Sequence, residues 1–203
     1  AQAGAPAARM KNWVMPLLLM LLAAPCGAAN DFLMNLKKAA SRVERDERVE
    51  YYSRAIRAWQ PSDSKTLLSQ CHFGRAQARV ESYLFAEAES DLTIALELDP
   101  RNAPAYLLRA RVYARQAKHT LAAKDLIEYV GRNPSDFEGL LLLGQTEFKK
   151  GRTDASVRAY SLAQKNEAAD ERAWIGEAQI YIARKDWPRA ERTLDVAVEK
   201  AHG

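Results

Sequence analysis

The chain has 203 residues, of which 48% are hydrophobic, so it is long enough to bury a core of its own. Only 9 glycines and 8 prolines interrupt it, and we therefore expect it to be mostly helical. The net charge of +4 is small and includes Arg9 and Lys11, which stand in an N-terminal segment without acidic residues. The rest of the surface is mixed in sign, which argues against a basic stripe for nucleic acid.

The N-terminal segment has the three parts of a secretory signal peptide. Met10 and Lys11 precede an apolar run from Val14 to Ala24, and small residues follow it. The run is shorter than the ~20 residues of a membrane-spanning helix, so a retained membrane anchor is the second interpretation. We therefore expect residues 1–29 to be a signal peptide or anchor, within which residues 1–9 could be upstream sequence. The protein is expected in an exported compartment, either the bacterial periplasm or membrane-associated envelope, or alternatively the lumen of the endoplasmic reticulum.

Cys26 offers a further interpretation of the same segment. The residues from Leu22 to Cys26 are similar to a bacterial lipoprotein box, in which the cysteine becomes lipid-modified, although Pro25 departs from that pattern. Membrane contact is therefore expected only through this segment, if it is uncleaved or lipidated. Cleavage after Ala29 would leave Cys71 as the only thiol, and no internal disulfide could then form.

Residues 30–64 carry two sets of residues with the spacing of an amphipathic helix. Tyr52 and Ala55 stand three residues apart, as Leu92 and Ala95 do later, so this segment is predicted to be a degenerate repeat or an N-terminal capping hairpin. A helix-breaking cluster, residues 60–64, separates it from the rest of the chain. The first set is Phe32, Leu33, Leu36, Lys37 and Ala40, and the second is Val49, Tyr52, Ala55, Ile56 and Trp59.

From residue 69 onward the sequence repeats every 34 residues without an insertion. Pro100 and Pro134 close the first two repeats, and Asp186 with Pro188 marks a helix start in the last. Residues that stand 34 positions apart form a column. Two columns hold small residues, a third holds large apolar residues and a fourth is mixed. In that order they are Ala76, Ala110, Gly144 and Ala178; Ala88, Ala122, Ser156 and Ala190; Leu92, Leu126, Tyr160 and Leu194; and Ala95, Tyr129, Ala163 and Ala197.

A 34-residue period with one small residue on each of two helical patterns is typical of helix–turn–helix arrays. The sequence resembles the tetratricopeptide repeat (TPR) family, which implies an all-α fold, a right-handed α-solenoid of helix–turn–helix repeats preceded by the helical hairpin. Residues 65–203 would form four units, 69–102, 103–136, 137–170 and 171–203. The family has a large residue near the start of the first helix, which is matched by Tyr106, Leu140 and Trp174. It also has a tyrosine one turn after the first small residue, which is matched by Tyr113 and Tyr181 but replaced by Arg79 and Glu147.

The resemblance implies a concave groove lined by the first helix of each unit. The expected surface is apolar with amides and cations, which suits a peptide or amphipathic helix that carries leucine-like and acidic side chains. The leucine pairs 107–108 and 141–142 could equally pack between helices, and the pattern leaves this open. The expected partner-binding residues are Phe73, Gln77, Leu107, Leu108, Arg111, Arg115, Leu141, Leu142, Gln145, Lys149, Ile175 and Gln179, with Gly74 and Gly176 beside them.

The sequence shows no pattern typical of catalysis. The three histidines stand in different units without a second ligand nearby, and neither a phosphate-binding loop nor a nucleophile elbow is present. No enzyme activity, metal or cofactor is therefore expected. The acidic residues of the second helices are interpreted as surface carboxylates, and three tryptophans as packing residues. These are Glu87, Glu89, Asp91 and Asp125, and Trp59, Trp174 and Trp187.

These observations predict a non-enzymatic scaffold that holds a partner protein, in envelope assembly or secretion. Two alternatives stay open: the client-binding part of a lumenal co-chaperone, and the regulatory domain of a larger enzyme. The last repeat also presents an apolar face that the next repeat would cover in a longer stack, so self-association there is a further prediction. That face comprises Ala178, Tyr181, Leu194, Ala197 and Val198.

Overall fold

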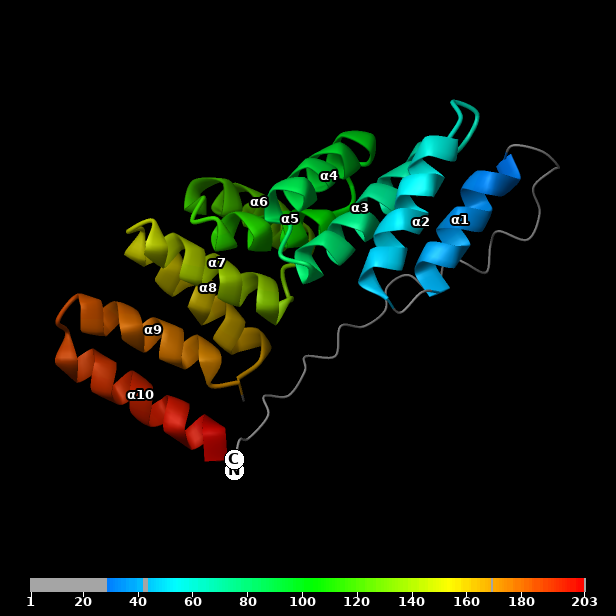
Figure 1. Ribbon diagram of the computed structural model, residues 1–203. Coiled ribbons are helices and arrows are strands. Elements are labelled where there is room, and N and C mark those ends of the chain that lie inside the picture. Colours follow the sequence, from blue (N-terminus) through cyan, green and yellow to red (C-terminus); the bar gives the residue numbers. More distant parts are fainter. Residues whose placement is uncertain (1–28, 42–43, 169, 203) are drawn as a thin grey trace. The chain divides into compact units, whose positions relative to one another are not determined.

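The computed structural model describes residues 29–41, 44–168 and 170–202 (Figure 1). The predicted signal peptide up to residue 28, with Cys26, lies outside the described residues. Those residues form ten helices and no strand, which confirms the all-α prediction. The helices are α1 (Ala29–Ser41), α2 (Arg45–Ala58), α3 (Lys65–Glu81), α4 (Phe85–Leu98), α5 (Ala103–Arg115), α6 (His119–Arg132), α7 (Phe137–Lys149), α8 (Thr153–Asn166), α9 (Arg172–Ala183) and α10 (Trp187–His202).

The chain divides into two compact units, residues 1–64 and 65–203. In the first unit, α1 and α2 pack against each other as a hairpin. Its buried apolar residues are Phe32, Leu36 and Ala39 from α1, and Tyr52 and Ala55 from α2. Ala39 takes the core position that the sequence pattern gave to Ala40, because residues 32, 36 and 39 share one helical face.

The second unit is a series of four helical hairpins, α3–α4, α5–α6, α7–α8 and α9–α10, which follow one another in Figure 1. Each hairpin contacts the next, through α4 and α5, α6 and α7, and α8 and α9. The buried apolar side chains run along these junctions, as expected for a solenoid whose repeats contact only their neighbours.

The turns inside the four hairpins of the second unit have the same backbone geometry. One residue adopts a positive φ at the same place in each repeat: Tyr83 (60°), Ala117 (58°), Gly151 (76°) and Lys185 (59°). In each case the next residue's N–H donates to the carbonyl five residues before it, for example Lys118 to Tyr113 at 2.8 Å. This is a Schellman-type helix end, which glycine favours and which only Gly151 signals in the sequence.

Side-chain caps and prolines set the other helix boundaries. Asn102 accepts a hydrogen bond from the backbone N–H of Ala105 at 3.2 Å, and Asp136 accepts one from Gly139 at 2.7 Å. Both residues are therefore N-caps of the following first helices. The preceding second helices end at Leu98 and Arg132, just before the Asp-Pro and Asn-Pro pairs that the sequence analysis identified as helix stops.

The column that contains Leu92, Leu126 and Tyr160 fills the junctions between repeats, and Tyr160 is its largest residue. Leu92 and Leu126 are fully buried, and Tyr160 replaces leucine in the next repeat with 1% exposure. Its ring fits because two glycines face it: a Cβ at Gly144 would lie 2.7 Å from Tyr160 Cε1, and one at Gly176 would overlap the ring. Large and small residues thus compensate each other across this junction.

Candidate protein-binding surface

The first helices α3, α5, α7 and α9 carry the residues predicted to bind a partner. Spacings of three or four along each helix place these residues on one face. The first helices α3 and α5 contact each other, as α7 and α9 do. We call the resulting row the first-helix surface. It consists of Phe73, Gln77, Leu107, Arg111, Arg115, Leu142, Gln145, Lys149, Ile175 and Gln179, all of which are half-buried or exposed.

The leucine pairs divide between this surface and the core. Leu108 is 8% exposed and belongs to the cluster around Leu92, while Leu141 is 6% exposed and packs near Tyr160. Both are therefore unavailable to a partner and are removed from the set of contact residues. Gly74 and Gly176 are buried as well, the latter under the Tyr160 ring.

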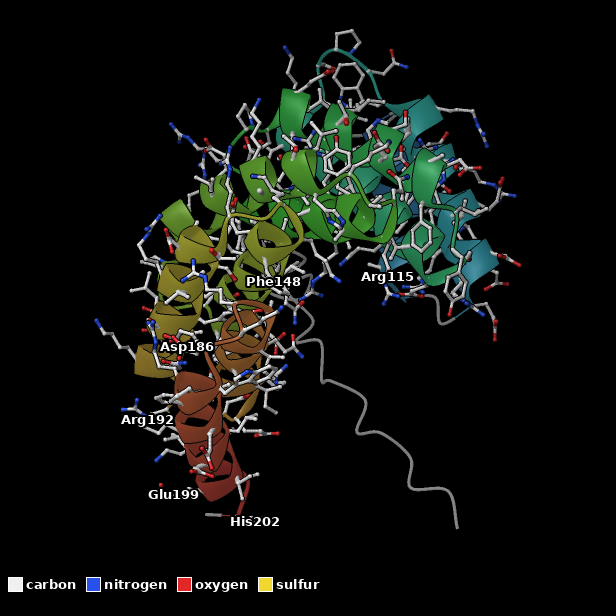
Figure 2. All side chains as sticks on the ribbon, turned by 90° about the vertical axis from the view of Figure 1, so that its left-hand side faces the viewer. Arg115, Phe148, Asp186, Arg192, Glu199 and His202 are labelled. Atoms are coloured by element: carbon white, nitrogen blue, oxygen red, sulfur yellow. The ribbon has the colours of Figure 1, made fainter. Side chains whose placement is uncertain are left out.

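Two apolar residues that the sequence analysis did not select extend the surface. Phe148 and Ile182 stand three residues after Gln145 and Gln179, and helical periodicity places them on the same face. Phe148 is half-buried and Ile182 is 41% exposed. Figure 2 shows Phe148 and Arg115 at the ends of α7 and α5, on the same side of the stack. The i+3 spacing was the signal that could have identified both residues.

The cations of the surface lie on its two middle helices. Arg111 and Arg115 lie on α5 and Lys149 on α7. Arg115 and Lys149 are exposed, whereas Arg111 is half-buried near Tyr129, where its charge partly offsets the other causes that raise the pKa of that phenol. Burial is the largest of those causes, and the pKa of Tyr129 rises to about 12. The middle of the surface is thus apolar and positively charged at neutral pH.

An ion-paired cluster borders the surface at the start of α9. Arg172 donates to Asp170 at 2.7 Å and pairs with Glu138 of α7 at 2.7 Å. Burial alone would raise the pKa of Asp170, but hydrogen bonds from Arg172 outweigh it and lower that pKa. These charges are matched within the chain, which leaves the cations of α5 and α7 as the better candidates for contact with a partner.

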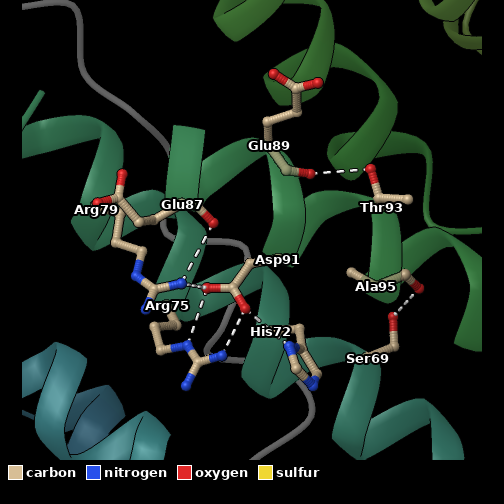
Figure 3. Close-up of polar contacts among 9 residues, drawn as sticks. All are labelled: Ser69, His72, Arg75, Arg79, Glu87, Glu89, Asp91, Thr93 and Ala95. Atoms are coloured by element: carbon tan, nitrogen blue, oxygen red, sulfur yellow. Dashed lines mark hydrogen bonds and ion pairs between the residues drawn. The ribbon is translucent and has the colours of Figure 1, made fainter. Parts of the chain in front are cut away.

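Asp91 and Asp125 correct one expectation, because they are buried and ion-paired. Asp91 is 1% exposed and accepts hydrogen bonds from His72 Nδ1 at 2.9 Å and from Arg75 Nη2 at 2.6 Å (Figure 3). Arg79 also binds it. Burial alone would raise the pKa of Asp91, but these three partners lower it.

The second repeat contains the equivalent pair. Asp125 is 3% exposed and accepts bonds from Arg109 Nε at 2.7 Å and Nη2 at 2.9 Å. Arg75 and Arg109 are one repeat apart, as Asp91 and Asp125 are, so the shared period was the missed signal. Glu87 is exposed, and Glu89 is half-buried and paired with Lys118 at 2.7 Å.

The remaining candidate residues divide between packing and exposure. Trp59 and Trp174 are half-buried, but Trp187 is 60% exposed, so its interpretation as a packing residue was wrong. Cys71 is fully buried, and burial raises the pKa of its thiol to about 12.

Among the described residues no three His, Cys, Asp or Glu side chains are grouped to hold a metal ion. The helices of those residues also lack the length and apolar character needed to cross a membrane.

The stack of helical hairpins, with its row of accessible first-helix side chains, defines a repeat protein of the α-solenoid class. The profile of the tetratricopeptide repeat family matches residues 73–137, 109–171 and 141–203. The chain therefore belongs to the tetratricopeptide repeat family, as its 34-residue period indicated. A comparison with curated proteins finds no match.

Solved structures with the same fold share little sequence with this chain. A crystal structure of MamA protein superposes with a TM-score of 0.78 at 15% identity and covers 86% of this chain and 93% of its own. MamA from Desulfovibrio magneticus RS-1 gives 0.76 at 16% identity, covering 88% and 98%. YrrB, described as a TPR protein with an unusual peptide-binding site, gives 0.74 at 18% identity, covering 83% and 84%. These similarities establish the fold.

Proposed function

We propose that the protein is a non-enzymatic scaffold that binds a peptide or helix of a partner protein on its first-helix surface. The observation that carries the proposal is that Gln77, Arg111, Gln145 and Gln179, which stand 34 residues apart in four successive repeats, are all half-buried or exposed. Leu107, Leu142 and Ile175 offer apolar contact area, and the glutamines beside them offer hydrogen bonds. A row of this kind fits an extended or helical segment better than a small molecule.

Charge adds a preference to this apolar row. Arg111, Arg115 and Lys149 are the cations of the surface, so a partner segment with acidic residues beside its apolar anchors is favoured. YrrB, whose fold this chain shares, is described as having a peptide-binding site. That description supports peptide binding here by analogy of fold, while the residues named above carry the specific proposal.

We place the scaffold in an exported compartment, where it would serve envelope assembly or secretion. The support is the basic, apolar and small-residue order of residues 10–29. A fusion of residues 1–29 to a reporter enzyme that is active only after export tests this placement. Reporter activity is expected, and an inactive fusion that stays in the cytoplasm would contradict the placement.

The binding surface is tested by charge reversal at exposed positions. Arg115→Glu with Lys149→Glu changes the first-helix surface without touching the core, unlike a change at Leu108. The matched control is Arg101→Glu with Lys124→Glu, two exposed cations outside that surface. A partner captured from the native envelope fraction should be retained by the parent chain and the control and lost by the first variant. Equal retention by all three would move the binding site elsewhere.

A further inference from the structure

A hollow of about 260 Å³ lies between α6, α7 and α8, apart from the first-helix surface. Its walls are mostly apolar and include Ile127, Leu143 and Leu162. Ile127 and Leu162 are 57% and 47% exposed at its edge, and the cations Arg152 and Arg158 flank it. The volume falls just below the roughly 300–1,000 Å³ of small-molecule pockets, so one large side chain is a better fit.

The hollow lies at the junction between the second and third repeats, and we call the equivalent place at each junction the seam. It exists because the third repeat lacks the polar groups that occupy the seam in the repeats on either side. In the second repeat Arg109 spans it, bonded to Asp125 and, at 3.2 Å, to Thr93. One repeat later the same three positions hold Leu143, Ala159 and Ile127, which are shorter or apolar. At the junction with the fourth repeat, Gln164 and Tyr181 each donate a hydrogen bond to Glu177.

Glu147 contributes a buried carboxylate to the wall of the hollow. It lines the hollow with 3% exposure, and its Oε1 accepts a bond from Lys150 at 2.9 Å. Its Oε2 is buried and has no hydrogen-bond partner among the described residues. An unsatisfied buried acceptor is costly, and native proteins contain few of them. A donor that reaches this oxygen would therefore bind favourably.

The neighbouring repeats indicate which donor fits. Tyr113 and Tyr181 stand at the position of Glu147 in the second and fourth repeats, so the third repeat lacks a tyrosine ring at this seam. In the fourth repeat the Tyr181 hydroxyl donates to the carboxylate of Glu177 at 2.9 Å, which shows that a phenol and a buried glutamate are compatible here.

We propose that the hollow binds a tyrosine side chain of a partner protein, with its hydroxyl donating to Glu147 and an acidic neighbour facing Arg152 and Arg158. The apolar walls suit the aromatic ring, and the free carboxylate oxygen suits its hydroxyl. A cationic side chain fits less well, because Lys150 already pairs with Glu147 and the two arginines would repel it. The site is distinct from the first-helix surface and could bind a second segment of the same partner.

The test uses the full chain and three capped tripeptides, N-acetyl-Glu-Tyr-Glu-amide and its phenylalanine and lysine counterparts, in an NMR titration. The tyrosine peptide should shift the amide signals of Ile127, Ala159 and Leu162. The phenylalanine peptide should bind roughly ten-fold more weakly, the effect of one hydrogen bond to a charged group. No shift at millimolar peptide, equal binding of the tyrosine and phenylalanine peptides, or tighter binding of the lysine peptide would overturn the proposal.

Two variants show whether the hollow itself binds the peptide. Leu143→Arg with Ala159→Asp recreates the pair that Arg109 and Asp125 form in the second repeat, and should close the hollow and abolish the shifts. Ile127→Glu changes only an exposed edge residue and should weaken binding of the acidic peptide even if the double variant folds poorly. Binding that survives both changes would place the peptide elsewhere.

Discussion

Buried charge is the main polar feature of the first repeat at the level of single residues. Asp91 is enclosed by His72, Arg75 and Arg79, so it links α4 to α3 through both of its oxygens. A buried carboxylate of this kind is stable only while its partners remain, because an unpaired charge in the interior is strongly unfavourable.

We expect Asp91→Ala to lower the free energy of unfolding by about 3–5 kcal/mol, because it leaves arginine charges partly buried without a partner. Glu87→Ala, at an exposed residue four positions earlier on α4, should change stability by less than about 0.5 kcal/mol. Urea denaturation followed by circular dichroism measures both. Similar effects of the two changes would show that the Asp91 cluster contributes little to stability.

The same cluster predicts acid sensitivity. The pKa of Asp91 lies below its ordinary value of 3.8 in the folded chain, so the unfolded chain takes up protons first as the pH falls. The contribution of Asp91 is therefore present at neutral pH and is lost as the pH falls below about 4. Urea midpoints between pH 3 and pH 6 should decline on the acid side in the parent chain and decline less in Asp91→Ala. Parallel curves would contradict this assignment.

Compensation in size between Tyr160 and two glycines gives a second prediction for single residues. Gly176→Ala should destabilise the chain by about 1–3 kcal/mol, because the new methyl group overlaps the Tyr160 ring. Tyr160→Leu restores the residue of the two preceding repeats and should remove most of that penalty in the double variant. Additive effects in this double-mutant cycle would show that the two residues are not coupled.

At the level of secondary-structure elements, the hairpin turns are the common unit of the stack. Four turns share one backbone geometry, but only Gly151 is a residue that adopts positive φ without strain. Ala117 holds φ at 58° with a Cβ, which is unfavourable by about 1–2 kcal/mol. The geometry persists because the Schellman bond at each turn satisfies helix carbonyls that would otherwise lack a partner.

Ala117→Gly is therefore expected to stabilise the chain by about 0.5–1 kcal/mol. This is less than the full relief of strain, because glycine also has more conformational entropy in the unfolded state. The control is Ala114→Gly inside α5, where glycine lacks this benefit and should destabilise by about 1 kcal/mol. Differential scanning calorimetry measures both shifts in Tm. A lower Tm for Ala117→Gly would show that this turn is unstrained.

Sequence periodicity predicted the elements well and their polar contacts poorly. The 34-residue columns and the Asp-Pro and Asn-Pro stops located the helices, because apolar spacing and proline act locally. Asp91 was misassigned to the surface because its burial depends on arginines of another helix. Leu107 could not be separated from Leu108 by pattern, since adjacent apolar residues fit either face, and only the packed neighbours show that Leu108 is core.

For the whole molecule, the last repeat differs from the others in how its junction residues are covered. Leu194 is 38% exposed, whereas Leu92 and Leu126 at the same position are fully buried. Trp187 and Val198 on the same helix are 60% and 57% exposed. Together they form an apolar patch on α10 of the kind that marks protein contacts.

Self-association through this patch stays a prediction. We expect sedimentation velocity to show a concentration-dependent oligomer that Val198→Glu abolishes, because a charge at an exposed contact disfavours association without disturbing the core. Arg192→Glu, at an exposed charged residue of α10, is the control. A monomer at all concentrations would contradict the prediction.

The central claim is that the first-helix surface binds a protein partner, and site-specific photo-crosslinking in the native cell tests it most directly. A photoreactive residue would replace Gln145 or Gln179 on that surface, and Glu97 or Arg192 on second helices as exposed controls. The account predicts one shared adduct at Gln145 and Gln179 that is absent at the controls. Adducts confined to Glu97 or Arg192 would contradict it and place the binding site on the second helices.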